Sequence, residues 1–187
     1  MENQIKKTNN FNEIYLQHTK HRNIFVCEPI TKELASTLTA LLFYYDSVGD
    51  DQITIFINSV GGDVAALYNI YDVMQMIKSP ISTICIGKAY SAAAVILAAG
   101  TPGLRLAFKN SNIMIHGVQC VFPTMNETDI KSSQNYFEFL TKTNDSVLKM
   151  LSSHTGQKID KVKIDSKRDL FMDSKEALSY GMIDKII

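Results

Sequence analysis

The sequence has few cysteines and no long apolar run. Its three cysteines, Cys27, Cys85 and Cys120, form no C-x-x-C pair and leave one odd, which favours a reducing compartment over a disulfide framework. The first residues, MENQIKK, contain no apolar stretch, so we expect no secretory signal peptide. No apolar run reaches the roughly 18 residues of a membrane span. These absences predict a cytoplasmic protein.

An excess of charge of one sign is also absent. The 19 lysine and arginine residues are balanced by 19 aspartate and glutamate residues, so the net charge is zero. Proteins that bind nucleic acid or anionic membranes usually carry a basic surface. We therefore expect neither nucleic acid nor a membrane among the partners of this chain.

Several motifs of familiar enzyme classes are missing. The sequence contains no G-x-S-x-G, the nucleophile elbow of α/β-hydrolases. Neither a P-loop nor G-x-G-x-x-G occurs, so we expect no bound nucleotide. No group of histidines, cysteines and carboxylates has the spacing of metal ligands. We therefore expect no cofactor and no metal.

What remains is an alternation of apolar runs with helical patterns. Runs typical of buried strands lie at residues 24–26, 53–57, 81–86, 104–108 and 113–115. Apolar residues recur at helical spacing after Thr31, after Gly61-Gly62-Asp63 and after Ser91. Such alternation is typical of βαβ units with a parallel sheet. We predict an α/β fold in a single domain, residues 1–187.

The two ends of the chain differ from this alternation. Residues 1–20 are polar, and we expect an N-terminal segment without regular structure. Residues from about 126 to 153 form one long helical pattern, which either projects toward a partner or packs across the sheet. Asp173 and Glu176 have the spacing of a capping box, which predicts a short last helix before a strand at residues 182–187.

Ser91 lies at a predicted strand-to-helix junction. The apolar run 84–86 precedes it, and residues 92–100 are almost wholly small or aliphatic. The first N–H groups of a helix are unpaired and its dipole favours negative charge, as an oxyanion requires. Ser91 is therefore either a nucleophile beside an oxyanion site or a helix N-cap.

A serine nucleophile needs a base and a third group that orients the base. His116 is the candidate base, because it follows its strand as Ser91 follows its own, and strand ends of one sheet can meet. The alternative is a structural histidine. Asp165 and Asp169 cannot be separated as the orienting acid, whereas Asp173 already has a capping role. The other histidines suit solvent or a helix end: His18, His21 and His154.

The Gly61-Gly62 turn follows an apolar strand. Two consecutive glycines let the backbone approach a ligand closely and expose N–H groups. The turn could form part of an oxyanion hole or an edge for a peptide, and a plain turn is the alternative.

Short motifs from about residue 14 to the C-terminus resemble, in order, the ClpP family, the proteolytic subunit of the ATP-dependent Clp protease. The motifs are INSVGGD at 57–63, YDVMQMIK at 71–78, STICIG at 82–87, AYSAAA at 89–94, LAAG at 97–100, NSNIMIH at 110–116, HTGQ at 154–157, RDLFM at 168–172 and EALSYGMID at 176–184. The resemblance implies a ClpP/crotonase-like β/α spiral. It also implies that the long helix is a handle through which two heptameric rings stack.

The resemblance also implies roles for single residues. Ser91 falls on the nucleophile of the family, His116 on the general base, and Asp169, within Arg-Asp-x-Phe, on the orienting acid. Gly62 and Ala92 fall on the positions whose backbone N–H groups form the oxyanion hole. The residues that would contact the substrate are Gly61, Gly117 and Val118.

The sequence departs from the family pattern in several places. Val60 replaces the usual proline, and Ala92-Ala93 replace the usual Met-Gly, but the oxyanion donors are backbone groups and should persist. Gly117-Val118 stand where Gln-Pro is usual, and residues 119–124 replace a glycine-rich loop. The handle segment is about one helical turn longer, and both ends of the chain are short. We expect differences in the substrate cleft, ring stacking and unfoldase docking.

The sequence thus predicts a serine endopeptidase subunit that degrades unfolded polypeptides inside a tetradecamer of stacked rings, fed by an AAA+ Clp unfoldase. One alternative is a catalytically silent or structural subunit of a ring mixed with a ClpP paralogue, against which the intact Ser/His/Asp set argues. The other is a phage-type maturation protease of the same fold, which the divergent loop would permit. A crotonase-type acyl-CoA enzyme would not need this set of residues.

Overall fold

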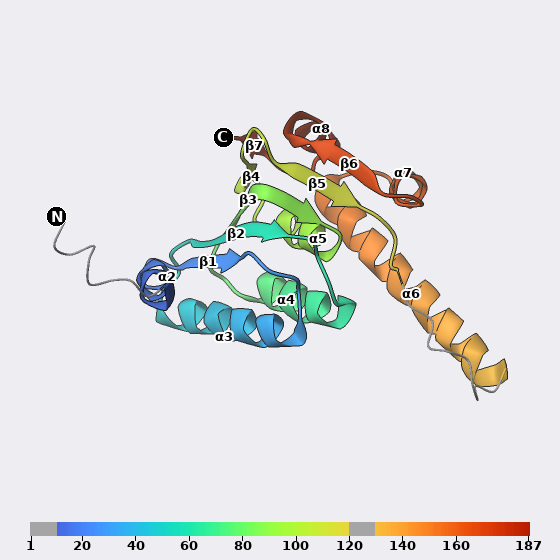
Figure 1. Ribbon diagram of the computed structural model, residues 1–187, viewed down its shortest axis with the longest axis horizontal. Coiled ribbons are helices and arrows are strands. Elements are labelled where there is room, and N and C mark those ends of the chain that lie inside the picture. The colour runs from blue at the N-terminus through green and yellow to red at the C-terminus, as the bar shows by residue number, and fades with distance from the viewer. Residues whose placement is uncertain (1–10, 120–129) are drawn as a thin grey trace.

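The computed structural model describes residues 11–119 and 130–187. Strands and helices alternate along most of the chain (Figure 1). The helices are α2 (Phe11–Thr19), α3 (Lys32–Val48), α4 (Val64–Met76), α5 (Ala92–Ala98), α6 (Ile130–Thr155), α7 (Ile159–Asp165) and α8 (Ser174–Tyr180). The strands are β1 (Asn23–Val26), β2 (Ile53–Ser59), β3 (Ile81–Tyr90), β4 (Arg105–Ala107), β5 (Asn112–Ile115), β6 (Leu170–Asp173) and β7 (Lys185–Ile186).

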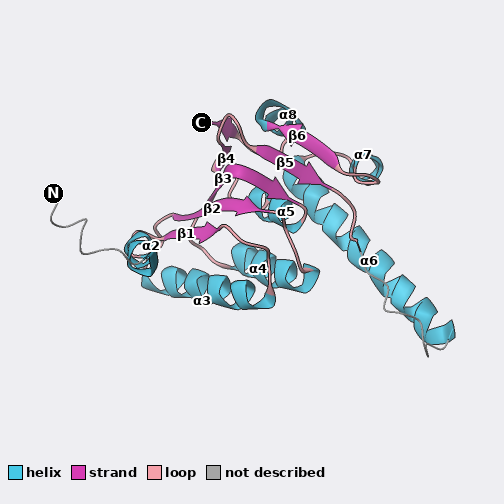
Figure 2. Cartoon of the chain, in the orientation of Figure 1, coloured by secondary structure: helices cyan, strands magenta, loops and turns pink. Residues whose placement is uncertain are grey.

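Parallel pairing dominates the sheet that these strands form. Along one path the order is β1-β2-β3-β4-β7, and each neighbouring pair on it is parallel. β5 pairs in parallel with β3 and antiparallel with β6. Helices α3 and α4 cover one side of β1, β2 and β3 (Figure 2). The predicted α/β fold class is confirmed.

The first βαβ units form where the apolar pattern predicts them. Helix α3 begins after Thr31, whose hydroxyl accepts a hydrogen bond from the Leu34 N–H at 3.2 Å. Helix α4 begins after Asp63, whose carboxylate accepts one from the Ala66 N–H at 2.8 Å. Both caps satisfy N–H groups that the helix itself leaves unpaired. The residues that these helices bury against the sheet include Leu38, Leu42, Leu67 and Ile70.

Strand β3 is shared between two branches of the sheet. Its first half pairs with β4, and its second half, Lys88–Tyr90, pairs with β5. Between the halves the register against β2 shifts in the interval from Ile57 to Ser59. Gly87, with a φ of +96°, lies in this bulge, where glycine adopts a conformation that strains other residues. The bulge therefore directs the end of β3 toward β5.

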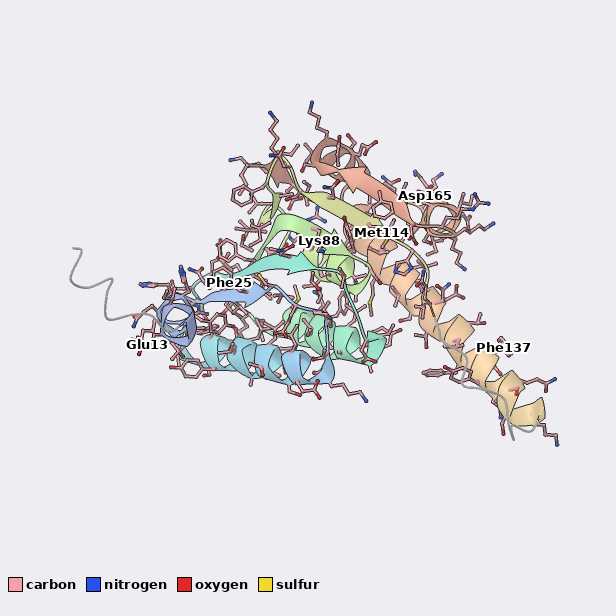
Figure 3. All side chains as sticks on the ribbon, in the orientation of Figure 1. Glu13, Phe25, Lys88, Met114, Phe137 and Asp165 are labelled. Carbon is pink, nitrogen blue, oxygen red and sulfur yellow. The ribbon has the colours of Figure 1, made fainter. Side chains whose placement is uncertain are left out.

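The absence of regular structure expected for residues 1–20 is wrong where the structure describes them, because Phe11–Thr19 form α2. Contacts with distant residues hold this helix. The ring of Tyr15 lies 6.1 Å from the ring of Phe25 on β1 (Phe25 is labelled in Figure 3). The Tyr45 hydroxyl donates to the carbonyl of the last residue of α2 at 2.6 Å. Such contacts are invisible to local sequence periodicity.

Helix α6 projects from the rest of the chain (Figure 1). The expected start near residue 126 lies outside the described residues, and the helix ends at Thr155, just beyond the expected 153. Figure 3 shows Phe137 on the projecting part, where Phe139 is 61% exposed. Near the other end, α6 buries Val147, Leu148 and Leu151. Helix α6 therefore does not pack across the sheet along its whole length, which was the alternative to a projecting helix. Neither α6 nor any other described helix is apolar enough to cross a membrane.

Candidate active site

Ser91 lies where β3 ends and α5 begins. Its φ is 55° and its ψ −123°, a region that non-glycine residues rarely adopt. Ser91 occupies the N-cap position of α5, but its side chain makes no capping hydrogen bond. Its N–H donates to the Met114 carbonyl on β5 at 2.8 Å. Capping therefore does not account for the hydroxyl.

The Gly61-Gly62 turn packs directly behind this junction. Gly61 has a φ of +86°, and a Cβ placed on it would lie 2.5 Å from the Tyr90 carbonyl oxygen and 2.8 Å from the Ser91 Cβ. A Cβ on Gly62 would collide with the carbonyl of Ile30. Both positions therefore require glycine, for close approach and at Gly61 also for backbone conformation.

Gly61→Ala is expected to destabilise the fold by more than Gly103→Ala. The two residues have nearly equal φ values, +86° and +88°, so each alanine strains the backbone by about 1–2 kcal/mol. Nothing lies within 4 Å of a Cβ at Gly103, whereas Gly61 adds a collision with Tyr90 and Ser91. We expect an extra loss of about 2 kcal/mol in the free energy of unfolding at Gly61, measured by urea denaturation. Equal losses for the two variants would contradict the close approach.

Two backbone N–H groups beside Ser91, those of Gly62 and Ala92, have no acceptor within residues 11–119 and 130–187. Ala92 is the first residue of α5, where helix N–H groups lack partners. Gly62 forms a β-bridge with Ile30, but the two hydrogen bonds of this bridge involve the carbonyl of Gly61 and the N–H of Asp63. The bridge therefore does not use the N–H of Gly62. Two unpaired N–H donors, one on the glycine turn and one on the first residue of α5, can stabilise a negatively charged oxygen between them.

His116 and Asp169 meet at the ends of paired strands. Ile115, the last residue of β5, lies opposite Leu170, the first residue of β6, so the residues just beyond are neighbours. His116 Nδ1 lies 3.8 Å from Asp169 Oδ1. This nitrogen is buried and has no hydrogen-bond partner in the described part of the chain. Buried polar atoms of structural residues are mostly hydrogen-bonded, and no such bond accounts for this nitrogen, whose nearest ionisable group is Asp169.

The competing acids are engaged elsewhere. Asp165 accepts a hydrogen bond from the Tyr180 hydroxyl at 2.9 Å and forms an ion pair with Lys161 at 2.5 Å. Asp173 caps α8 with the predicted capping box. The structure thus has Asp169, and not Asp165, beside His116, a distinction that the sequence makes only through the resemblance to the family.

His154, in the last turn of α6, has a structural environment. Its Nε2 lies 2.9 Å from the Tyr71 hydroxyl. Burial, and secondarily the nearby Arg105 guanidinium, lower the pKa of His154 below its usual value. The imidazole is therefore neutral near pH 7, so a favourable charge–dipole interaction at this helix end does not arise.

A cavity of about 330 Å³ brings most of the predicted residues together. Gly61 is not on its wall but packs behind Ser91. Apolar side chains from α4, α5 and α6 complete the wall. In the described ranges, no three His, Cys, Asp or Glu residues are grouped as metal ligands. The predicted residues that line the cavity are Gly62, Ser91, Ala92, His116, Gly117, Val118 and Asp169.

The segment that follows His116 is held from behind by other elements. The Gly117 N–H donates to the Ser166 carbonyl at 2.8 Å. The Val118 N–H donates to Oδ1 of Asn144, on α6, at 2.9 Å. Sequence reasoning missed this role of Asn144, because the residue lies 26 positions after Val118 and outside every motif that resembles the family.

One comparison with known protein families bears on this arrangement. The family model described as Clp protease matches residues 6–187. The match includes every strand of the sheet, the junction at Ser91 and the described length of α6. It covers far more than half of the sequence, and the chain therefore belongs to the Clp protease family.

Proposed function

We propose that this chain is a serine endopeptidase subunit that hydrolyses unfolded polypeptides. Its family membership supports a ClpP-like protease with serine peptidase chemistry in general. The observation that carries the specific assignment is the setting of Ser91. Its hydroxyl makes no capping hydrogen bond, and its backbone conformation is strained. It shares a cavity with His116 and with the residues of the two unpaired N–H donors.

In the proposed reaction, His116 takes the proton from Ser91 Oγ as this oxygen attacks the carbonyl carbon of the substrate. Asp169, on the Nδ1 side of the ring, orients the imidazole and stabilises its protonated form. When the C–N bond breaks, His116 gives the proton to the leaving amine. Water then attacks the acyl-enzyme by the same route and releases Ser91.

The negatively charged oxygen formed in each step would accept hydrogen bonds from the Gly62 and Ala92 N–H groups. Removing one such donor costs about 100- to 1,000-fold in kcat in serine proteases. Because both donors belong to the backbone, the alanines after Ser91 and the valine before the glycine turn can support the same chemistry.

The substrate is proposed to lie extended between the glycine turn and residues 117–118. Gly62, Gly117 and Val118 all lie on the cavity wall. The N–H groups of Gly117 and Val118 are already paired behind the wall, so the C=O groups of these residues would pair with the main chain of a peptide, whatever its sequence. Gly61 contributes by letting the turn approach Ser91.

The proposed catalytic contacts are long in this structure. The Ser91 hydroxyl has no hydrogen bond in the described part of the chain, and the His116–Asp169 separation of 3.8 Å exceeds a hydrogen-bond length. In free enzymes such contacts often shorten only when substrate binds. The same looseness favours the second candidate, a catalytically silent subunit of a mixed ring.

A serine-directed fluorophosphonate separates the two candidates. We expect it to label Ser91, measured by intact mass and peptide mapping, and to leave Ser91→Ala unlabelled. His116→Ala is expected to slow labelling by about 1,000-fold or more, because the nucleophile loses its base. His21→Ala, at an exposed histidine outside the cavity, is the matched control and should label at the normal rate. Failure of the wild-type chain to label in its assembled form would favour the silent subunit.

We further propose that two heptameric rings stack through the projecting part of α6 and that an AAA+ unfoldase supplies substrates. The exposed aromatic residues Tyr136 and Phe139 on a projecting helix support an interaction at this place. Light scattering on the labelled sample is expected to show a tetradecamer. A monomer that labels fully would contradict the ring, and assembly only with a paralogue would indicate a mixed ring.

A further inference from the structure

Residues 116–119 form a partition between two cavities. The cavity of about 330 Å³ on one side contains Ser91. A second cavity, of about 430 Å³, is lined by side chains of α6 and α7 and by the segment that follows α7. Both cavities are lined by all four residues of the partition. A residue that holds the partition from the cavity beside α6 therefore also sets the width of the cavity that contains Ser91.

Asn144 holds the partition from the second cavity. It lines that cavity but not the one that contains Ser91. Its side-chain oxygen accepts the Val118 N–H at 2.9 Å, and only the oxygen of the amide can accept. The same oxygen would lie 2.9 Å from a Cβ on Gly117. The hydrogen bond thus holds the backbone at Val118 without reaching the reacting atoms.

The helix that carries Asn144 is itself held in place on both sides of this residue. The carbonyl of Thr143 accepts a hydrogen bond from the Tyr68 hydroxyl of α4 at 3.1 Å. Asp145 forms an ion pair with Lys163 of α7 at 2.9 Å. A side chain on a helix anchored in this way defines the position of a backbone segment more closely than a loop residue does.

The hydrogen bond depends on the residue type at position 118. Valine at this position carries the N–H that the bond requires, whereas a proline would carry none. The contact with Asn144 therefore exists only while residue 118 is not proline.

We propose that Asn144 is a positioning residue for substrate binding, which acts through Val118 to hold the partition against an extended peptide. The inference rests on the proposed function, because it assumes that a peptide lies along residues 117–118. Loss of the acceptor leaves the Val118 N–H unsatisfied and loosens the wall. Binding of extended peptides then weakens, while chemistry at Ser91 continues.

The test compares two variants of nearly equal size. Asn144→Leu removes the acceptor, and Asn144→Asp keeps it. For a fluorogenic peptide of several residues, we expect Asn144→Leu to raise KM about tenfold and to change kcat by less than about twofold. Fluorophosphonate labelling of Ser91, which needs no extended peptide, should stay within about twofold. Asn144→Asp should keep KM within about threefold of the wild-type value.

A second pair of variants serves if Asn144→Leu does not fold. Gly117→Ala places a Cβ against Oδ1 of Asn144, so it should raise KM on its own. Adding Asn144→Ala removes the opposing oxygen, and the double variant should then have the KM of Asn144→Ala alone. Independent effects of the two substitutions would overturn the proposed contact.

The other outcomes are equally decisive. A wild-type KM in Asn144→Leu overturns the inference. So does an equal loss of labelling and of peptide hydrolysis, because it would place the effect on Ser91, His116 or the fold. If the wild-type chain cannot be labelled at all, the proposed function fails, and this inference fails with it.

Discussion

Replacing Ser91 with glycine is expected to abolish peptide hydrolysis and at the same time to raise the melting temperature. Loss of a serine nucleophile costs about 10⁶ in kcat in a well-studied protease. The φ of 55° and ψ of −123° suit glycine, whereas serine in such a conformation is strained by about 1–3 kcal/mol. Glycine has more conformational entropy in the unfolded chain, and this offsets about 0.5–1 kcal/mol of the strain that is relieved. A net stabilisation of about 1 kcal/mol is expected, or about 3 °C in calorimetry.

Ser91→Ala is the matched control for this experiment. It removes the same hydroxyl but keeps a Cβ, so activity should be lost without relief of backbone strain. The glycine variant should therefore be more stable than the alanine variant by about 1–2 kcal/mol. An alanine variant of equal or greater stability would show that the backbone at Ser91 is not strained. The expected result would mean that this chain gives up stability to place one hydroxyl.

Arg105→Met is expected to cause the largest loss of stability. Arg105 is only 8% exposed, and its guanidinium donates to the carboxylate of Asp184 and to the carbonyls of Ala98, His154 and Gly181. These carbonyls lie at the C-terminal ends of α5, α6 and α8, where helices leave such groups without partners. Methionine leaves the three carbonyls without this donor and removes the ion-pair partner of Asp184, whose carboxylate keeps only the backbone N–H groups of Gly103 and Arg105. We expect a loss of about 3–5 kcal/mol in the free energy of unfolding, measured in urea.

Acid provides the internal check on this loss. The Arg105 side chain is the main cause that holds the pKa of Asp184 below its usual value. A lowered pKa contributes stability above the unfolded-state pKa of about 4, and this stability is lost as the pH falls through the folded-state pKa. The methionine variant lacks this contribution. The stability gap between wild type and variant should therefore narrow below about pH 4, and an unchanged gap in acid would contradict the role of Asp184.

Sequence periodicity predicted the helices and strands that contribute several regularly spaced residues to the core. In β2 the alternate residues Ile53, Ile55 and Ile57 are fully buried, and such alternation of burial is visible in a sequence. Helix α7 and strand β6 were not predicted, because they bury one residue each, Val162 and Met172. They form through contacts with neighbours, β6 by pairing with β5. No local pattern reports such pairing.

The candidate site divides in the same way. Ser91 and His116 could be selected because each follows an apolar strand, and strand ends of one sheet can meet. The choice of Asp169 over Asp165 needed either the family motif or the β5–β6 register. Asn144 needed the structure, because its contact joins a helix to a loop that is distant in sequence.

The bulge in β3 divides the strand into two stretches under different constraints. The insertion or deletion of one residue before the bulge alters the pairing with β4. The bulge at Gly87 can absorb this shift, which leaves the later register intact. The insertion or deletion of one residue in Lys88–Tyr90 would reverse the side-chain direction relative to β5 and turn Ser91 away from His116. The spacing of the proposed nucleophile and base therefore depends on Lys88–Tyr90 and on the residues of β5 with which they pair. Insertions before the bulge can accumulate without changing it.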